Sequence, residues 1–317
     1  MSDHVQADHP HNHVHEHTHG TSEGSTRRLT IVLVATAGYM LVEAIAGWLT
    51  NSLALLADAG HMLTDAGAIA LALFAAHISR LPRNHQKTFG YYRAEILAAL
   101  ANAVALILIV VGIAWEAYGR LVEPQQVMGR EMMIVAAIGL VVNLFGAWIL
   151  HGGSDHRHSM NVRGVFLHII GDALGSVAAI IAGLLMWWKG WMWADPATSG
   201  LIGLVILYGA IRLTGDSLHV LMEGTPARID VTDLRVALEN LDGVTDVHDL
   251  HVWSLSSSLE SISVHLRTID VGEVESILTR ARDLLENEFG LKHSTIQVET
   301  PGFEETACSF DAEGAAE

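Results

Sequence analysis

The stretch EILAALANAVALILIVVGIAWEAY runs from Glu95 to Tyr118 and carries no charged residue between Glu95 and Glu116. About 20 apolar helical residues are needed to cross roughly 30 Å of hydrocarbon, so this stretch predicts a membrane-spanning helix. Five further apolar stretches of similar length lie at residues 29–50, 53–77, 131–150, 164–188 and 197–221. The sequence therefore predicts an α-helical membrane protein with six transmembrane helices.

Charge divides the chain into parts. The net charge of −17 over 317 residues falls mostly on the part from Glu223 onward. We expect a disordered His-rich leader (1–27), the six-helix domain (28–222), a cytoplasmic domain (223–302) and a disordered acidic tail (303–317). The leader holds seven histidines between His4 and His19, a composition typical of weak metal binding without a fold. The acidic soluble part argues against nucleic acid as a partner and favours cations.

Lys and Arg fall mostly on one side of the predicted membrane. Eight precede the first span or lie in the loops after the second and fourth spans, whereas Arg120, Arg130 and Lys189 lie on the opposite side. By the positive-inside rule, both termini of this multi-pass protein are predicted to lie in the cytoplasm, with a plasma or inner membrane around the spans. Asp195 falls near a span end, where we expect it to be solvated.

Two predicted spans carry a histidine and an aspartate four residues apart: His61 with Asp65, and His168 with Asp172. Residues at this spacing share one helix face. Two such helices, if they face each other, offer two imidazole nitrogens and two carboxylate oxygens, a set suited to tetrahedral Zn²⁺. Ionisable residues in mid-bilayer are costly and mark sites that pair, bind or conduct. A hydrogen-bonded packing device is the alternative for one pair, and the repetition favours a metal site.

Two more acidic residues lie within the spans. Asp58 precedes His61 by three residues, so it is predicted to orient the ligands or accept protons next to them. Glu43 lies deep in the first span, and helix pairing explains it as well as function does.

The chain resembles the cation diffusion facilitators, and their zinc-transporting branch especially. The resemblance rests on LLADAGHMLTD (55–65), FGYYRAE (89–95), the pair His168 and Asp172, and VHDLHVWS (247–254). It implies a homodimeric antiporter that exchanges metal for H⁺, needs no cofactor, and carries Zn²⁺ as its substrate. In that family a histidine at the position of His61 implies a preference for Zn²⁺, with Cd²⁺ and Co²⁺ as lesser substrates.

Residues 226–300 show amphipathic periods in place of long apolar runs. Helices are predicted at 230–241 and 272–289, and strands at 245–254, 259–267 and 294–299. This order resembles the ferredoxin-like cytoplasmic α+β domain of the family. The resemblance implies regulatory Zn²⁺ ligands among five residues: His248, His251, His265, His293 and Glu299. Gln297 and Glu299 replace a His and an Asp of some members, so part of that site is expected to differ.

Two other functions share the same ligands: a membrane-embedded metalloenzyme, and a metal sensor that carries no flux. The predicted spans and the cytoplasmic domain have no His-Glu-x-x-His, Gly-x-Ser-x-Gly or nucleotide-binding loop; the first two patterns occur only in the leader, at 15–19 and 20–24, where no fold is expected. A catalytic zinc also keeps an open position for water, whereas two His and two Asp can fill a tetrahedron. The sequence thus favours a transporter driven by an ion gradient.

Overall fold

The computed structural model describes residues 23–79, 81–151, 160–257, 259–301 and 303. The predictions for the His-rich leader up to residue 22 and for the tail from residue 304 lie outside this part. Six long helices come first: α1 (Glu23–Thr50), α2 (Leu53–Ser79), α3 (Ala94–Val122), α4 (Gly129–His151), α5 (Met160–Lys189) and α6 (Ala194–Leu221). Among the described residues five of them, α2 to α6, are long and apolar enough to cross a membrane, and α1 contributes the shorter apolar stretch Val34–Thr50. The six predicted spans correspond to these six helices.

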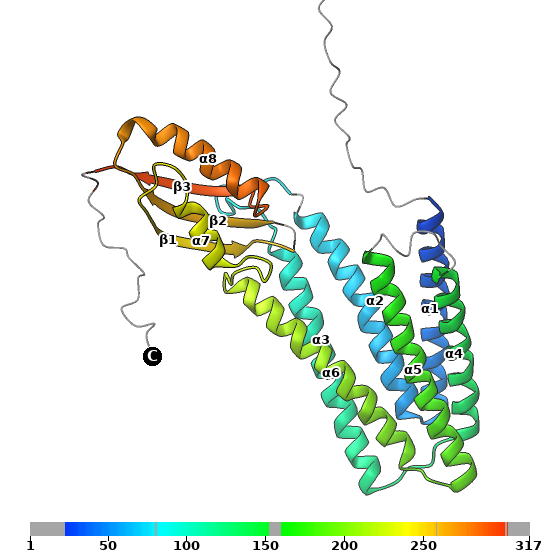
Figure 1. The fold of residues 1–317 in the computed structure, drawn as a ribbon. Coiled ribbons are helices and arrows are strands. Elements are labelled where there is room, and N and C mark those ends of the chain that lie inside the picture. The colour runs from blue at the N-terminus through cyan, green and yellow to red at the C-terminus, as the bar shows by residue number, and fades with distance from the viewer. Residues whose placement is uncertain (1–22, 80, 152–159, 258, 302, 304–317) are drawn as a thin grey trace, which may run out of the picture.

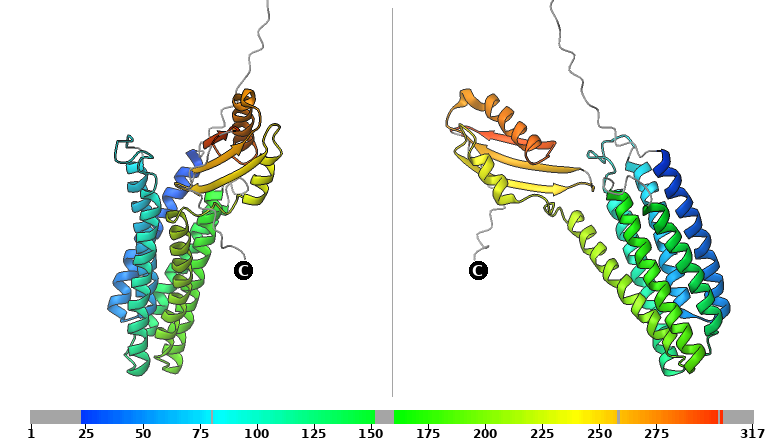
Figure 2. Two further views of the ribbon diagram at one scale, coloured as in Figure 1. Left: turned by 90° about the vertical axis from the view of Figure 1, so that its left-hand side faces the viewer. Right: turned by 45° about the vertical axis from the view of Figure 1, so that its right-hand side comes forward.

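The six helices form two groups (Figures 1 and 2). Helices α1, α2, α4 and α5 stand together, while α3 and α6 pack along each other and lean towards the cytoplasmic domain. Glycines bring α4 and α5 into backbone contact: a Cβ atom placed on Gly183 would lie 2.7 Å from the carbonyl oxygen of Gly129. Small residues of this kind let helices approach closely in lipid, where no hydrophobic force drives them together.

The expectation that Asp195 is solvated is wrong. Its side chain is fully buried and accepts hydrogen bonds from the Ser52 hydroxyl (2.7 Å) and from the backbone N–H groups of Leu53 (2.8 Å) and Ala54 (3.1 Å). The first N–H groups of a helix lack partners within the helix, so the α6 carboxylate caps the N-terminus of α2. Arg120 of α3 joins the same junction, with its Nη1 atom 3.6 Å from Asp195 Oδ2.

The cytoplasmic domain follows in the order α7 (Val231–Glu239), β1 (Asp246–Ser254), β2 (Glu260–Arg267), the 3-10 turn η2 (Val271–Glu273), α8 (Val274–Asn287) and β3 (His293–Glu299). Strands β1 and β2 pair antiparallel, and β2 and β3 pair parallel. The α-β-β-α-β order is the predicted one.

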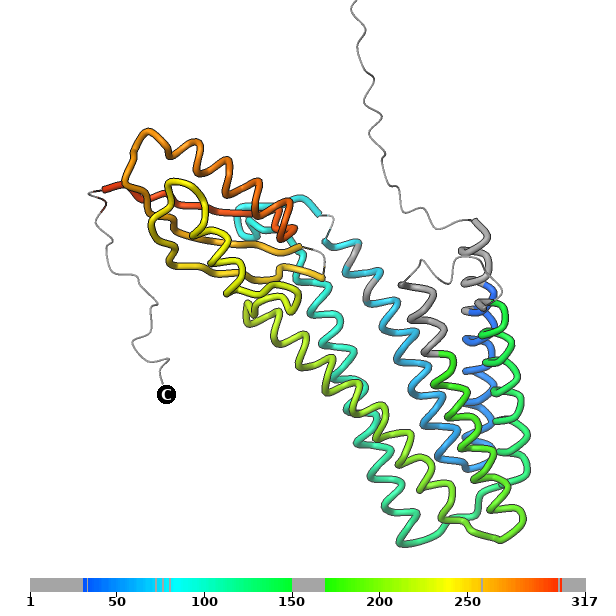
Figure 3. Tube along the Cα trace, in the orientation of Figure 1, coloured from blue at the N-terminus to red at the C-terminus, as the bar shows by residue number. Residues whose placement is uncertain are grey.

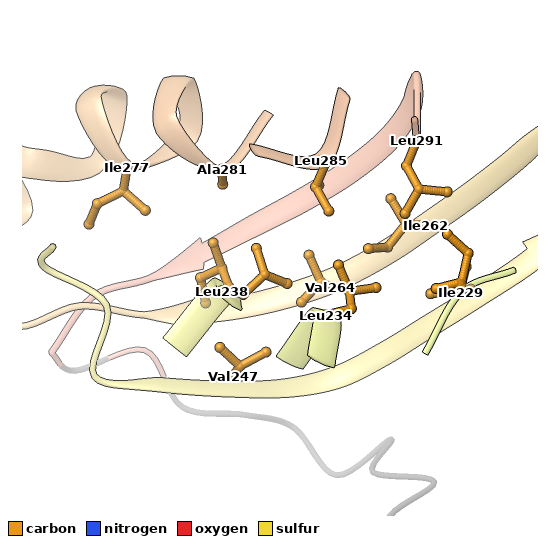
Figure 4. Packing of buried hydrophobic residues seen from close by; sticks show 12 residues of the cluster. Ile229, Leu234, Leu238, Val247, Ile262, Val264, Ile277, Ala281, Leu285 and Leu291 are labelled. Atoms are coloured by element: carbon orange, nitrogen blue, oxygen red, sulfur yellow. The ribbon is translucent and has the colours of Figure 1, made fainter. Parts of the chain in front are cut away.

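One hydrophobic core holds this domain together. Side chains from both helices meet those of the sheet in it (Figure 4), including Leu234 and Leu238 of α7, Ile277 and Leu285 of α8, and Val264 of β2. Because successive side chains of a strand point to opposite faces, the residues between the core positions lie on the face away from the helices. That outer face is free to carry polar chemistry.

The loop between α2 and α3 reaches the cytoplasmic domain (Figure 3). Phe89 in this loop meets the ring of His293 edge-on, with centroids 5.9 Å apart. Glu95, in the first turn of α3, accepts a hydrogen bond from the Ser257 hydroxyl (2.6 Å). Arg93, just before α3, pairs with Glu223, just after α6, at 2.7 Å. These contacts join the two parts of the chain.

Candidate functional site

The first candidate site lies between α2 and α5. His61 and Asp65 lie one turn apart on α2, with His61 Nε2 3.5 Å from Asp65 Oδ2, and both side chains are partly exposed. Asp172 on α5 is buried. His168 occupies α5 one turn before Asp172, but its side chain lies outside the described part of the structure. Three of the four predicted ligands are therefore described as side chains.

The two helices approach each other at the level of these pairs. Figure 1 shows α2 and α5 side by side. A Cβ atom placed on Gly175 of α5 would lie 3.7 Å from Asp58 Oδ1 of α2. Gly175 follows Asp172 by three residues, and Asp58 precedes His61 by three. Since residues at this spacing are neighbours on a helix surface, the two His–Asp pairs lie on approaching parts of α2 and α5.

Asp58 and Glu43 are both buried in the bundle, as neighbours of each other. The Tyr39 hydroxyl lies 3.1 Å from Glu43 Oε1 and 3.2 Å from the Val135 carbonyl oxygen, and its one hydrogen is shared between these two acceptors. Helix α1 thus adds a carboxyl group and a phenol close to the site, and α4 adds a carbonyl. A role for Asp58 and Glu43 in orienting the ligands stays a prediction.

The second candidate site lies on the outer face of the cytoplasmic sheet. Strand pairing aligns six outward residues in two neighbouring rows: Asp246, Arg267 and Glu299 in one, and His248, His265 and Gln297 in the other. Each row takes one residue from each strand. A backbone pairing, and not closeness in sequence, brings these side chains together.

Three of these six outward residues offer metal ligands close to one another. Ligand atoms of His248, His265 and Glu299 lie within 4.8 Å of each other. His248 Nε2 is 3.3 Å from Glu299 Oε2, and His265 Nδ1 is 3.2 Å from Glu299 Oε1. Two imidazoles and one carboxylate make a donor set that fits Zn²⁺ and leaves a fourth position open.

Glu299 lies on the outer face of the sheet, beside Arg267 of β2. It is nevertheless only 3% exposed. Burial alone would raise the pKa of this carboxyl, but a hydrogen bond from Gln297, the nearby His248 and a hydrogen bond from Arg267 outweigh burial and lower it. Glu299 is therefore a buried, ionised carboxylate at neutral pH, surrounded by side-chain nitrogens.

The other two predicted cytoplasmic ligands do not join the cluster. His293 lies at the start of β3, against Phe89 of the α2–α3 loop. His251 is exposed, and its Nε2 atom lies 2.8 Å from Asp249 Oδ1. The strand register shifts between His248 and His251, and Asp249 has a φ of 49° there. This β-bulge takes His251 out of step with the row of His248 and His265.

Sequence reasoning missed Asp246 and Arg267. Arg267 Nε donates to Glu299 Oε2 (3.3 Å) and Nη1 donates to Asp246 Oδ2 (3.4 Å). Asp246 Oδ2 also lies 3.2 Å from His248 Nδ1. The alternation along each strand places these residues on the outer face, but only the register between strands shows that they are neighbours.

Two family descriptions together match residues 29–222 and 226–301. "Cation efflux transmembrane domain" matches residues 29–222, and "Cation efflux protein, cytoplasmic domain" matches residues 226–301. A solved structure, the "Metal-bound C-terminal domain of the CzcD transporter" from Cuprividus metallidurans, is 30% identical, with a TM-score of 0.21, and covers 22% of this chain and 99% of its own.

Full-length relatives are similar over the same range. The "Cadmium, cobalt and zinc/H(+)-K(+) antiporter" of Bacillus subtilis is 45% identical, covering 88% of this chain and 91% of its own. The "Zinc transporter ZitB" of Escherichia coli is 42% identical, covering 87% and 88%. The "Metal cation efflux system protein CzcD" of Cupriavidus metallidurans is 39% identical, covering 87% of each. The chain thus belongs to the cation efflux family, the cation diffusion facilitators, and is a metal cation efflux antiporter of the membrane, not an enzyme.

Proposed function

We propose that this antiporter moves Zn²⁺ out of the cytoplasm in exchange for protons, and that His61, Asp65, His168 and Asp172 bind the transported ion. The observation that carries the proposal is a His–Asp pair on each of two helices that approach each other. Mixed nitrogen and oxygen ligands suit Zn²⁺ and the similar ions Cd²⁺ and Co²⁺. The names of the relatives agree, since the Bacillus relative is named for cadmium, cobalt and zinc and the Escherichia relative for zinc.

Protons are the proposed counter-ion because a protonated ligand cannot bind metal. Binding of Zn²⁺ to His61 or His168 requires a neutral imidazole, so the ion displaces any proton held there. When the ion leaves on the far side, the emptied ligands can take protons and return them inward. The name of the Bacillus relative also includes K⁺, so the role of K⁺ is an arm of the test below.

We also propose that the protein is a homodimer with both termini in the cytoplasm. The structure removes one objection to this orientation. Arg120 lies on the side that the positive-inside rule disfavours, but its guanidinium is buried against Asp195 and donates to the Asn51 carbonyl oxygen at 2.6 Å. A cation held in an ion pair within the bundle is not a free loop charge of the kind that sets topology.

The outer face of the cytoplasmic sheet supports a second, regulatory role. His248, His265 and Glu299 would hold a Zn²⁺ ion there, at a site far from the bilayer interior. We propose that occupancy of this cluster reports the cytoplasmic metal concentration to the transporter. No cofactor is required for transport itself in this proposal.

Purified protein reconstituted in sealed vesicles tests the main proposal. Zn²⁺ entering through the cytoplasmic face should accumulate faster when the lumen is acidic, and an ionophore that collapses the pH gradient should slow it. The same flux should persist when K⁺ is replaced by a large organic cation. A flux that ignores pH on both sides would rule out proton coupling, and binding without flux would identify a sensor.

A further inference from the structure

Arg267 places a positive charge at the centre of the row of Asp246, Arg267 and Glu299 on the outer sheet face. Arg267 on β2 lies between Asp246 on β1 and Glu299 on β3, its direct partners in the strand register. We propose that Arg267 is a built-in competitor of the cytoplasmic metal ion, which occupies Glu299 until the metal displaces it. This inference rests on the regulatory site proposed above and names the residue that sets its affinity.

Both oxygens of Glu299 are already engaged. Oε1 accepts a hydrogen bond from Gln297 Nε2 (3.0 Å), and Oε2 accepts one from Arg267 Nε (3.3 Å). His248 Nε2 lies 3.3 Å from Oε2, and His265 Nδ1 lies 3.2 Å from Oε1. A zinc ion lies about 2.0–2.2 Å from its oxygen and nitrogen ligands. An ion bound between His248 and Glu299 Oε2 therefore competes with Arg267 for that oxygen.

Arg267 can yield, whereas Glu299 cannot. The side chain of Arg267 is 45% exposed and that of Glu299 is 3% exposed. A guanidinium stays charged at every physiological pH, so it leaves the site by moving and not by losing its proton. Its second partner, Asp246, is 48% exposed and can keep the guanidinium at the edge of the sheet. Displacement then costs the ion pair between Arg267 and Glu299.

The charge of Arg267 also acts at a distance. The permanent positive charge of Arg267 beside the cluster repels an approaching divalent cation. Water at this half-exposed position weakens the repulsion without cancelling it. Both effects have the same sign, because each lowers the affinity of the cluster for metal. The free metal concentration at which the cluster fills is therefore higher than two histidines and a glutamate alone would set.

Zinc titration of the protein in detergent, with both its membrane and cytoplasmic domains, tests this inference. The background carries Asp172→Ala and lacks residues 2–20, so that the membrane site and the leader contribute little, and His248→Ala in this background defines the signal of the cluster. Arg267→Gln should tighten the His248-dependent affinity by about three- to tenfold, the range expected when a partly exposed, charge-assisted hydrogen bond no longer competes. Arg228→Gln is the matched control. Arg228 pairs with Glu260 in the same domain, away from the cluster, and its loss should leave the affinity unchanged.

Thermal unfolding separates competition from a merely structural role. Without zinc, Arg267→Gln should melt earlier than its parent, because Asp246 and Glu299 lose their shared cation. Saturating zinc should raise the melting temperature of the variant by more than it raises that of the parent. Arg267→Lys, which keeps the charge but not the two-pronged guanidinium, should show a smaller tightening and serves if Arg267→Gln does not fold.

The outcomes are distinct. Equal or weaker zinc affinity in both Arg267 variants overturns the competition. Absence of any His248-dependent zinc binding, in parent and variants alike, overturns the regulatory site itself.

Discussion

Asp195 Oδ2 and Arg120 Nη1 lie 3.6 Å apart in a buried ion pair at the end of the bundle opposite the cytoplasmic domain. The same aspartate caps α2, and the same arginine binds the Asn51 carbonyl oxygen in the turn before α2. Three helices therefore share one junction, and the start of the helix that carries His61 and Asp65 depends on it.

Asp195→Ala should destabilise the bundle strongly. Removing one partner of a buried pair leaves an uncompensated charge and typically costs about 3–5 kcal/mol, and the N-cap of α2 is lost as well. Thermal unfolding in detergent, followed by loss of the monodisperse peak, measures the effect. Glu116→Gln is the control, because Glu116 pairs with Arg120 from an exposed position and its removal should cost at most about 1 kcal/mol.

Asp65→Ala and Asp172→Ala should each abolish zinc flux into vesicles while the protein stays folded in the membrane. Each removes a negatively charged ligand that the two histidines cannot replace. Asp216→Ala is the matched control, since Asp216 lies exposed on α6 away from the site. Near-normal flux in both site variants would sink the ligand assignment.

His61→Asp should relax the selection against harder ions. The change replaces a nitrogen ligand by an oxygen ligand, which suits Mn²⁺ better than imidazole does. Competition between Zn²⁺ and Mn²⁺ in the vesicle assay measures the shift. An unchanged preference would place metal selection in other residues.

Glu299 should stabilise the cytoplasmic domain in a pH-dependent way. Its pKa is lower in the folded protein than its usual value. A carboxyl with a depressed folded pKa contributes stability above its unfolded pKa, about 4.3 for Glu, and loses it as the pH falls through the folded value. The stability difference between the parent and Glu299→Gln, from denaturant unfolding without zinc, should therefore be full near pH 7 and shrink below about pH 4. A difference that does not vary with pH would contradict the assignment.

Gly183→Ala should weaken the contact between α4 and α5. Its Cβ would lie 2.7 Å from the Gly129 carbonyl oxygen and 2.9 Å from Met133 Cβ, so the helices must separate. Overpacking of this kind typically costs about 1–3 kcal/mol. Gly112→Ala, at a position with no atom within 4 Å, should be neutral or slightly stabilising in the same melting assay.

The sequence was sufficient to predict the helices and strands, whereas the ligand role of the two His–Asp pairs in the membrane stays a prediction. Runs of apolar residues and the spacing of His61 and Asp65 are local properties of the sequence, and they do not depend on how the helices pack. The position of Asp195 depends on where α6 meets α2, and the row of Asp246, Arg267 and Glu299 depends on strand register. Neither relationship can be predicted from a short segment of the sequence. The burial of Asp195 and the position of Arg267 beside Glu299 were therefore not predicted.

Strand β3 carries Glu299 at one end and His293 at the other, where His293 touches Phe89 of the loop between α2 and α3. A seven-residue strand is about 20 Å long and, once paired in a sheet, does not stretch. It is a stiff element with the cluster of His248, His265 and Glu299 at one end and the loop that joins α2 and α3 at the other. A displacement of β3 at Glu299 would therefore also move His293, which contacts the loop that follows the helix bearing His61 and Asp65.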